Sequence, residues 1–412
     1  MEHKLNTNKS GIALALAGTL WILTAFSPHS AEIPHNMHDA GAEIFEIIIF
    51  LLTAMTLVEI LVHYQFFDII RNKIAQYRMS DRQQFYVVSL LTFFLSAALD
   101  NLTITIVMIQ IARKFFRDQA LLVVVAGIVV IANAGGAWSP IGDVTTIMLW
   151  LADKFSAAQI ISRGILPSLA LGITATLMMG RQLSSRKPKE APKQAERLRL
   201  TQSEKVVIGT ALGSFSLPLM MSFIGLPPYL GLLLGLGSTW LIIEFLRARS
   251  SQTTHLEANI DHLLQKTDLT SIKFFVGILL SVSALKTLGV LEILSHSLFG
   301  ADPSFWRVFG SNVLMGLFSA IFDNVPLTAL AIDILHVSDF RLWVLTALAV
   351  GTGGSTLVIG SVAGVIAMGM VKELSFGKYL KIASIPALVG YVIAMGVWLI
   401  QYNVLNYFAT TL

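Results

Sequence analysis

The stretch Ser96-Ala-Ala-Leu-Asp-Asn-Leu-Thr-Ile-Thr105 occurs a second time, with substitutions, as Ser319-Ala-Ile-Phe-Asp-Asn-Val-Pro-Leu-Thr328. Each copy lies at the middle of a long apolar run, residues 85–112 in the first case and 306–335 in the second. Basic residues lie at both ends of the first run, and one straight crossing cannot place both its ends on one side of a membrane. We therefore predict that each run folds as a re-entrant helical hairpin with its Asp-Asn pair at the tip.

A second pair of matching motifs follows these hairpins. Gly135-Gly136 with Ile141-Gly142-Asp143-Val144 corresponds to Gly353-Gly354 with Ile359-Gly360-Ser361-Val362 at identical internal spacing. Both motifs interrupt apolar runs, 119–151 and 342–370, which predicts two broken transmembrane helices. Irregular backbone at membrane depth is tolerated only where it is buried in protein or lines a cavity, so the breaks mark a candidate site. Two matched motifs in the same order predict an internal repeat.

The composition places the chain in a membrane. Of 412 residues, 55% are hydrophobic and 13% are charged, with a mean hydropathy of +0.71. Apolar runs of about 20 residues, enough to cross a bilayer, recur along the whole length. The predicted fold class is an all-α polytopic membrane protein. The absence of cysteine excludes disulfides and thiolate chemistry, and a net charge of +4 carried mainly by loops indicates membrane orientation rather than nucleic-acid binding.

The loop charges predict the orientation and the division of the chain. Basic residues between 71 and 82, in a segment predicted to be amphipathic, and again between 181 and 205 indicate cytoplasmic segments, whereas 28–42 has no Lys or Arg and is predicted to be an outside loop with three histidines. We expect an N-terminal repeat over 1–180, a basic cytoplasmic linker over 181–205 and a C-terminal repeat over 206–412. The ends of one hairpin then face inside and those of the other outside, so the repeats are inverted. The N-terminus would be cytoplasmic and the C-terminus periplasmic.

Buried carboxylates carry the predicted chemistry. An ionised Asp at membrane depth is costly unless it is paired, protonated or bound to a cation, and Na⁺, like other hard cations, prefers oxygen ligands. A carboxylate in such a place can hold Na⁺ or H⁺ and exchange one for the other. We predict a Na⁺ site at Asp100, Asn101, Asp143, Asp323 and Asn324. Further candidate ligands on the ion path are Ser96, Asn133, Thr145, Thr146, Ser319, Ser355 and Ser361, and Glu46, on an apolar span, is a candidate proton relay.

Several alternatives stay open at this stage. Asp100 and Asp323 could cap the hairpin helices instead of binding an ion. An anion carrier for arsenite or dicarboxylate is the main rival, although the motifs hold carboxylates and no Lys or Arg. A passive cation channel fits paired inverted hairpins less well. An intramembrane aspartyl protease is disfavoured because Pro140 stands where its Gly-x-Gly-Asp motif needs the first glycine.

The motifs resemble a known family. Residues 98–103, 132–143 and 322–328 are similar to the NhaD-type Na⁺/H⁺ antiporters of bacteria, within the ion transporter superfamily. The resemblance extends over nearly the whole chain. It implies export of sodium, and of lithium as a further candidate, driven by proton entry, with membrane lipid as the surroundings and no cofactor. By family analogy it also implies a homodimer.

Overall fold

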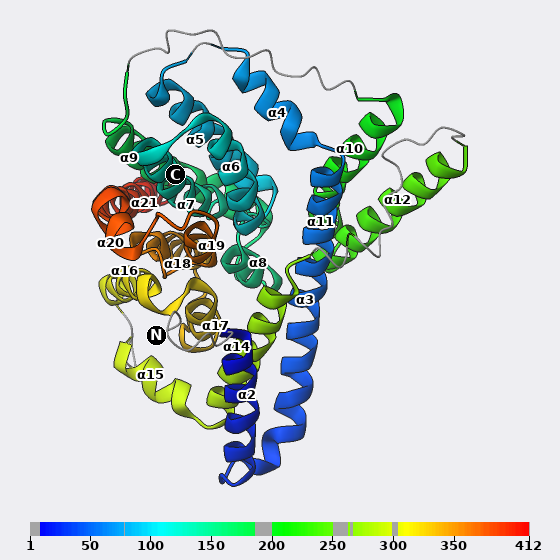
Figure 1. The fold of residues 1–412 in the computed structure, drawn as a ribbon. Helices are drawn as coiled ribbons and strands as arrows, with labels where there is room; N and C mark the ends of the chain where they lie inside the picture. The colour runs from blue at the N-terminus through cyan, green and yellow to red at the C-terminus, as the bar shows by residue number, and fades with distance from the viewer. Residues whose placement is uncertain are drawn as a thin grey trace. The chain divides into compact units, whose positions relative to one another are not determined.

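The computed structural model describes residues 9–77, 79–185, 200–249, 263, 267–298 and 304–411. Throughout these described segments the secondary structure is helical, without a strand (Figure 1). Eight helices in the described part are long and apolar enough to cross a membrane. The predicted all-α polytopic class is therefore confirmed. Most of the predicted basic linker, residues 186–199, and Arg78 lie outside the described residues.

The chain forms two compact units. Unit 1 comprises Met1–Tyr64, Gln202–Arg307 and Thr328–His336, and unit 2 comprises Gln65–Thr201, Val308–Leu327 and Val337–Leu412. Each unit thus draws on both predicted halves. Packing defines the units and sequence repetition defines the halves, so the repeat boundaries and their inversion stay predictions.

Unit 1 is built on long apolar helices. Helix α14 packs along both α2 and α3, and two buried side chains tie α14 to α2: the Ser10 hydroxyl donates to the Thr270 carbonyl and Trp21 Nε1 to the Leu280 carbonyl. An ion pair of 2.6 Å between Lys286 and Asp333 attaches the end of α17 to α14. The helices of this unit are α2 (Lys9–Ala25), η1 (Ser30–Glu32), α3 (Ile33–His63), α10 (Gln202–Ser214), α11 (Leu217–Phe223), α12 (Pro228–Arg249), α14 (Leu269–Thr287), α15 (Val290–Leu298) and most of α17 (Asn324–Ile334).

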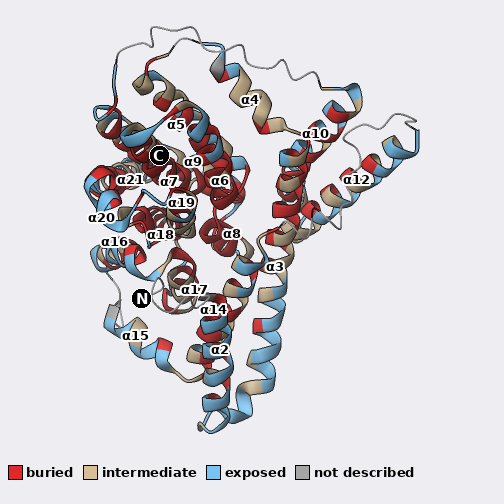
Figure 2. Ribbon diagram, viewed as in Figure 1, coloured by how far each residue is buried: buried red, intermediate tan, exposed pale blue. Residues whose placement is uncertain are grey.

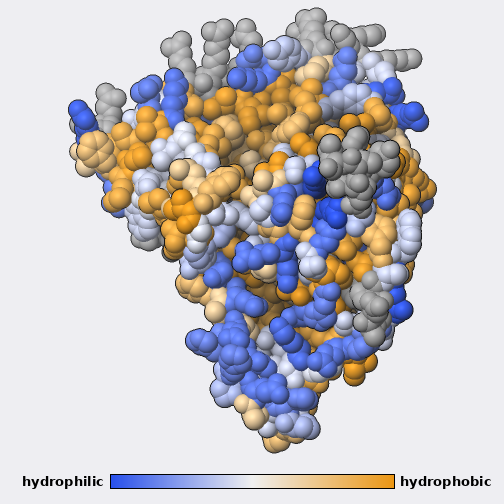
Figure 3. Space-filling view, turned by 180° about the vertical axis from the view of Figure 1, so that it is seen from behind, coloured by the Kyte–Doolittle hydropathy of each residue, from blue (hydrophilic) through white to orange (hydrophobic). Residues whose placement is uncertain are grey.

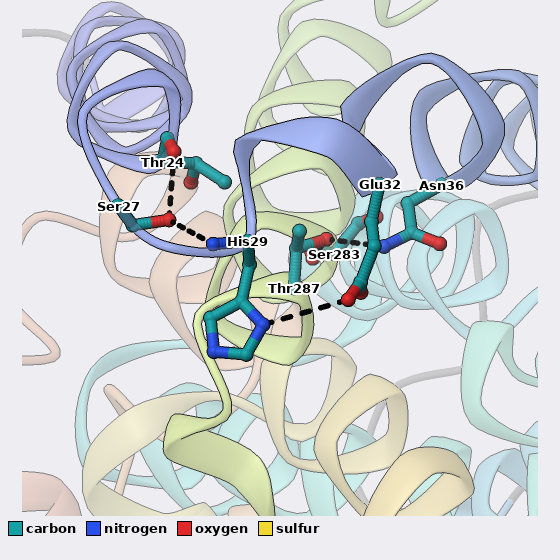
Figure 4. A network of polar contacts seen from close by, with 7 residues as sticks. All are labelled: Thr24, Ser27, His29, Glu32, Asn36, Ser283 and Thr287. Carbon is teal, nitrogen blue, oxygen red and sulfur yellow. Dashed lines mark hydrogen bonds and ion pairs between the residues drawn. The ribbon is translucent and has the colours of Figure 1, made fainter.

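The prediction of a loop over 28–42 is wrong, because most of this segment is helical, whereas its place on the outside stays a prediction. Figure 4 shows the tight turn after α2, in which the Ser27 hydroxyl donates to the Thr24 carbonyl and accepts from the His29 N–H. Helix α3 then starts with Pro34 in its first turn, where a missing N–H has no helical partner to lose. Asn36 Nδ2 donates to Thr287 Oγ1 at 3.1 Å, which holds this first part of α3 against α14.

Two further details of the helices were not predicted. The span predicted over 206–223 lies within Gln202–Phe223, one of the eight membrane-spanning candidates, and it is interrupted between α10 and α11 just before Pro218, a residue that cannot donate to the preceding turn. A short helix, α15, precedes the second hairpin just as α4 (Phe66–Ala75) precedes the first. The amphipathic character of 66–82 predicted α4, but α15 was not foreseen.

Unit 2 surrounds the two broken helices. Residues 122–136 of α7 and 342–353 of α18 are buried without exception, and Figure 2 shows this buried centre beside α6, α8 and α19. Helix α7 packs against α5, α6, α9 and α18, while α21 packs along α9. The helices of this unit are α4, α5 (Asp81–Ala98), α6 (Asn101–Phe115), α7 (Asp118–Gly136), α8 (Val144–Leu151), α9 (Ala157–Gly180), α16 (Phe305–Phe322), α18 (Phe340–Gly353), η2 (Gly354–Thr356), α19 (Val362–Met370), α20 (Phe376–Tyr379), the π-helix η3 (Leu380–Ser384) and α21 (Ile385–Thr411).

All four predicted interruptions are present. The hairpin helices end at Ala98 and Phe322, directly before the Asp-Asn tips, and the broken helices stop at Gly136 and Gly353. Apolar side chains also cover wide areas of the outer surface (Figure 3), as a lipid environment requires. Whether the hairpins re-enter from opposite sides stays a prediction.

Candidate functional site

Asp143 is the centre of the candidate site in unit 2. It precedes α8 in extended backbone, with φ −149° and ψ 148°, and its residue is only 1% exposed. Its N–H donates to Thr146 Oγ1 at 3.3 Å, and the Thr146 hydroxyl donates to the Asp143 carbonyl at 2.8 Å. These bonds start the helix, and the carboxylate, which lies beside the first turn of α8, is also contacted by side chains from other elements.

Two asparagines donate to this carboxylate. Asn101 Nδ2, from the first tip, lies 3.0 Å from Asp143 Oδ1. Asn324 Nδ2, from the second tip, lies 3.4 Å and 3.2 Å from Oδ1 and Oδ2. Both asparagines are buried, and the backbone N–H of Asn101 is also fixed by the Gly142 carbonyl at 3.1 Å. Both tips therefore form hydrogen bonds to the same carboxylate.

A third asparagine extends the contacts to the second helix break. Asn101 Nδ2 also donates to Asn133 Oδ1 at 3.0 Å, and Asn133 Nδ2 donates to Ser361 Oγ at 3.2 Å. The resulting hydrogen-bond chain, Ser361–Asn133–Asn101–Asp143–Asn324, joins all four sequence motifs. Asp143 is its single acidic member, and no member is cationic. We call these five residues the polar chain.

The acidic residues of the two tips, Asp100 and Asp323, cap the starts of helices. Asp100 accepts from the N–H groups of Leu102 and Thr103 at 3.3 and 3.1 Å and from the Thr103 hydroxyl at 2.9 Å. Asp323 accepts from the Val325 N–H at 3.4 Å and adopts a left-handed φ of 73°, which Asp tolerates better than most residues. Both carboxylates thus have the capping geometry that was the alternative to ion binding.

The candidate hydroxyl ligands divide by their partners. Ser96 donates to the Ala132 carbonyl at 2.7 Å and Ser319 to the Val350 carbonyl at 2.9 Å, so each links a hairpin to a broken helix. Ser355 donates to the Thr352 carbonyl of its own segment. Thr145, two residues after Asp143, is fully buried. Glu46 lies half-buried on α3 in unit 1 and is not among the residues that unit 2 brings together.

Glycines allow two backbone segments to approach closely within each break. The sequence alone shows only that these glycines recur in both motifs. A Cβ on Gly136 would collide with the Gly142 carbonyl, and a Cβ on Gly354 with the Gly360 carbonyl. Gly351 faces the site itself, because a Cβ there would lie 3.0 Å from Asp143 Oδ2. Gly351 lies within the apolar run 342–370 that was predicted to break, but its approach to Asp143 depends on packing between distant segments.

Apolar membrane-spanning helices, two of them broken around a buried polar chain, define a polytopic membrane transporter. A family model described as "Citrate transporter" matches residues 7–351, and the chain belongs to that family. Sodium/proton antiporter 1 of Arabidopsis thaliana is 37% identical over 98% of this chain and 70% of its own length, and sodium/proton antiporter 2 of the same plant is 35% identical over 98% and 96%. The Na(+)/H(+) antiporter NhaD of Alkalimonas amylolytica is 30% identical over 97% and 87%. The resemblance to NhaD-type proteins is confirmed.

Proposed function

We propose that the protein is a secondary Na⁺/H⁺ antiporter, with Asp143 as the group that holds the ion. The observation that carries this proposal is the polar chain: one buried carboxylate, contacted by side chains from both tips and linked to both breaks, among neutral oxygen-bearing residues. Relatives that share about a third of the sequence are named sodium/proton antiporters. A carboxylate in this position alternates between H⁺ and Na⁺ because one charge cannot neutralise both.

The asparagines give the exchange a structural basis. In the arrangement described, Asn101 and Asn324 turn their Nδ2 donors toward Asp143, which satisfies the carboxylate without a cation. A cation needs oxygen instead. Turning each amide by about 180° about χ2 exchanges Nδ2 for Oδ1 and supplies two neutral ligands beside the carboxylate. The orientation of the amide at each tip is then coupled to ion binding.

Transport of a carboxylate anion is the second candidate, because the matching family model carries the description of a citrate transporter. A polyanion needs cationic side chains or converging N–H donors that face the substrate. The polar chain instead centres on a negative side chain that occupies the nearest amide donors. This geometry favours a cation.

The proposal also covers the cofactor, the partners and the location of the protein. The protein works by moving ions rather than by breaking covalent bonds and needs no cofactor. Its partners are membrane lipid, Na⁺ and H⁺, with Li⁺ as a further candidate ion and a second copy of the chain as the expected assembly. We place it in a bacterial inner membrane with a cytoplasmic N-terminus and a periplasmic C-terminus, as the charge distribution indicates.

The test is sodium-induced proton movement in everted vesicles at alkaline pH. We expect Na⁺ to dissipate the proton gradient with the wild type, and Asp143→Asn to abolish the response because the variant keeps the shape but not the charge. Asp153→Asn, an exposed acid just after α8, is the matched control and should behave as the wild type. Citrate uptake in the same vesicles, with no response to Na⁺ or Li⁺, would establish the anion carrier instead.

A further inference from the structure

A groove opens on unit 2 between α5 and α9, with Ile131 of α7 at its base. It encloses about 200 Å³, and its walls are almost wholly apolar. The rim residues Leu90, Ile173 and Leu177 are 60%, 55% and 50% exposed. A groove with such a rim accepts an apolar chain from the side, as membrane lipid would present it.

One polar atom inside the groove has no partner. Ser89 lines the groove and is 4% exposed as a residue, and its hydroxyl makes no hydrogen bond. The serine and threonine hydroxyls on neighbouring turns behave differently: Thr92, for example, donates to the Val88 carbonyl at 2.7 Å. A buried unsatisfied hydroxyl costs free energy, and an acceptor atom supplied by a bound molecule would remove that cost.

Two arginines lie at one end of the groove. Arg82 is one helical turn before Tyr86, a lining residue, and therefore projects from the same side of α5. It bridges to the end of α9 by donating from Nε to the Gly180 carbonyl at 2.8 Å and from Nη2 to the Leu183 carbonyl at 3.1 Å. Arg181 is the next residue of this helix end and is exposed. Two cationic side chains therefore lie at this end, which is at the face predicted to be cytoplasmic.

We propose that this groove binds one anionic phospholipid, with an acyl chain between α5 and α9 and the phosphate at Arg82 and Arg181. The apolar walls match the chain, an ester carbonyl supplies the acceptor that Ser89 lacks, and the guanidinium groups match the charge. A zwitterionic lipid has the same acyl chains and a phosphate, but its headgroup cation offsets the negative charge that the two arginines favour. The proposal is independent of which ion the protein carries.

The bound chain would touch the support of the first helix break. Phe93 lines the groove, its ring stacks on Trp138 at a centroid distance of 6.0 Å, and its backbone leaves no room for a Cβ at Gly135. Trp138 belongs to the break that leads to Asp143. A lipid in the groove would therefore contact the residues that support the first helix break, and this break positions the Asp143 carboxylate.

Native mass spectrometry of the purified full-length protein with added phosphatidylglycerol or phosphatidylcholine tests the proposal. We expect one phosphatidylglycerol to be retained in preference to phosphatidylcholine. Thr176→Phe, which fills the groove, should weaken that binding about tenfold or more, since each buried methylene contributes. Arg181→Gln should weaken it about fivefold by removing one phosphate contact. Leu166→Phe and Arg163→Gln, on the same helix but outside the groove, are the matched controls and should change nothing.

Unfolding temperature confirms that each variant is folded, and Ser89→Leu provides a second groove-filling variant if Thr176→Phe is not. Equal retention of the two lipids would overturn the anionic headgroup. Undiminished phosphatidylglycerol binding by both filled variants would overturn the site. If the groove-filling variants lost a dimer peak while their lipid binding was unchanged, the groove would be assigned to a second copy of the chain, which would also overturn the proposal.

Discussion

At the scale of single residues, the two helix breaks have the same backbone and different chemistry. Asp143 and Ser361 precede α8 and α19 with nearly identical dihedral angles, −149° and 148° against −146° and 148°. One supplies a carboxylate and the other a hydroxyl, and Asn133 donates to the hydroxyl. The repeat therefore provides two equivalent positions but places the acidic group of the polar chain on one side only.

Gly351→Ala tests how closely the second break approaches this acidic group. The added Cβ would lie 3.0 Å from Asp143 Oδ2, which is too close for an unaltered carboxylate. Overpacking of about 1–2 kcal/mol predicts a roughly five- to thirtyfold increase in the half-saturating Na⁺ concentration, measured in vesicles. Gly369→Ala, where the Cβ meets nothing within 4 Å, is the control. An unchanged Na⁺ response would show that the second break does not bound the ion site.

At the scale of helices, each hairpin is fastened to a broken helix by one serine. Ser96 and Ser319 occupy equivalent motif positions, are fully buried, and donate to the carbonyls of Ala132 and Val350. Ser96→Ala and Ser319→Ala should each reduce the unfolding free energy by about 1 kcal/mol. Ser281→Ala should have a much smaller effect, because the Ser281 hydroxyl bonds within its own helix. Thermal unfolding of the purified variants measures the difference. Equal changes in the unfolding temperature of all three variants would show that Ser96 and Ser319 do not hold the hairpins to the broken helices.

Helix breaks could be predicted from the sequence, whereas the direction of the side chains at them could not. Paired glycines, Pro140 and polar residues within apolar runs indicated all four interruptions. The capping geometry of Asp100 and Asp323 depends on the dihedral angles of the tips, including a left-handed φ at Asp323, which hydropathy does not encode. The helical start of α3 was missed because absent basic residues suggested a loop, while Pro34 suits a first helical turn equally well.

At the scale of the whole molecule, competition at one carboxylate predicts a specific pH dependence. Protons and Na⁺ neutralise the same group, so lowering the pH should raise the half-saturating Na⁺ concentration without lowering the maximal rate. For one competing proton the rise approaches about tenfold per pH unit, and for two it is steeper. Transport rates across a matrix of pH and Na⁺ concentrations measure this slope. A half-saturating concentration that does not depend on pH would contradict shared binding and require a separate proton path.

The inverted arrangement of the repeats predicts exposure on opposite sides for one end of each hairpin. The chain has no cysteine, so one introduced thiol is the only target for a membrane-impermeant maleimide. Lys114→Cys, at the end of the first hairpin, should react only in everted vesicles, and Ser304→Cys, at the start of the second, only in intact cells, because the positive-inside rule places these exposed residues on opposite sides. Labelling of both from one side would make the repeats parallel. Asn101 and Asn324 would then reach Asp143 from tips that enter together, and alternation would need a different movement, since inverted tips open the site to one side at a time.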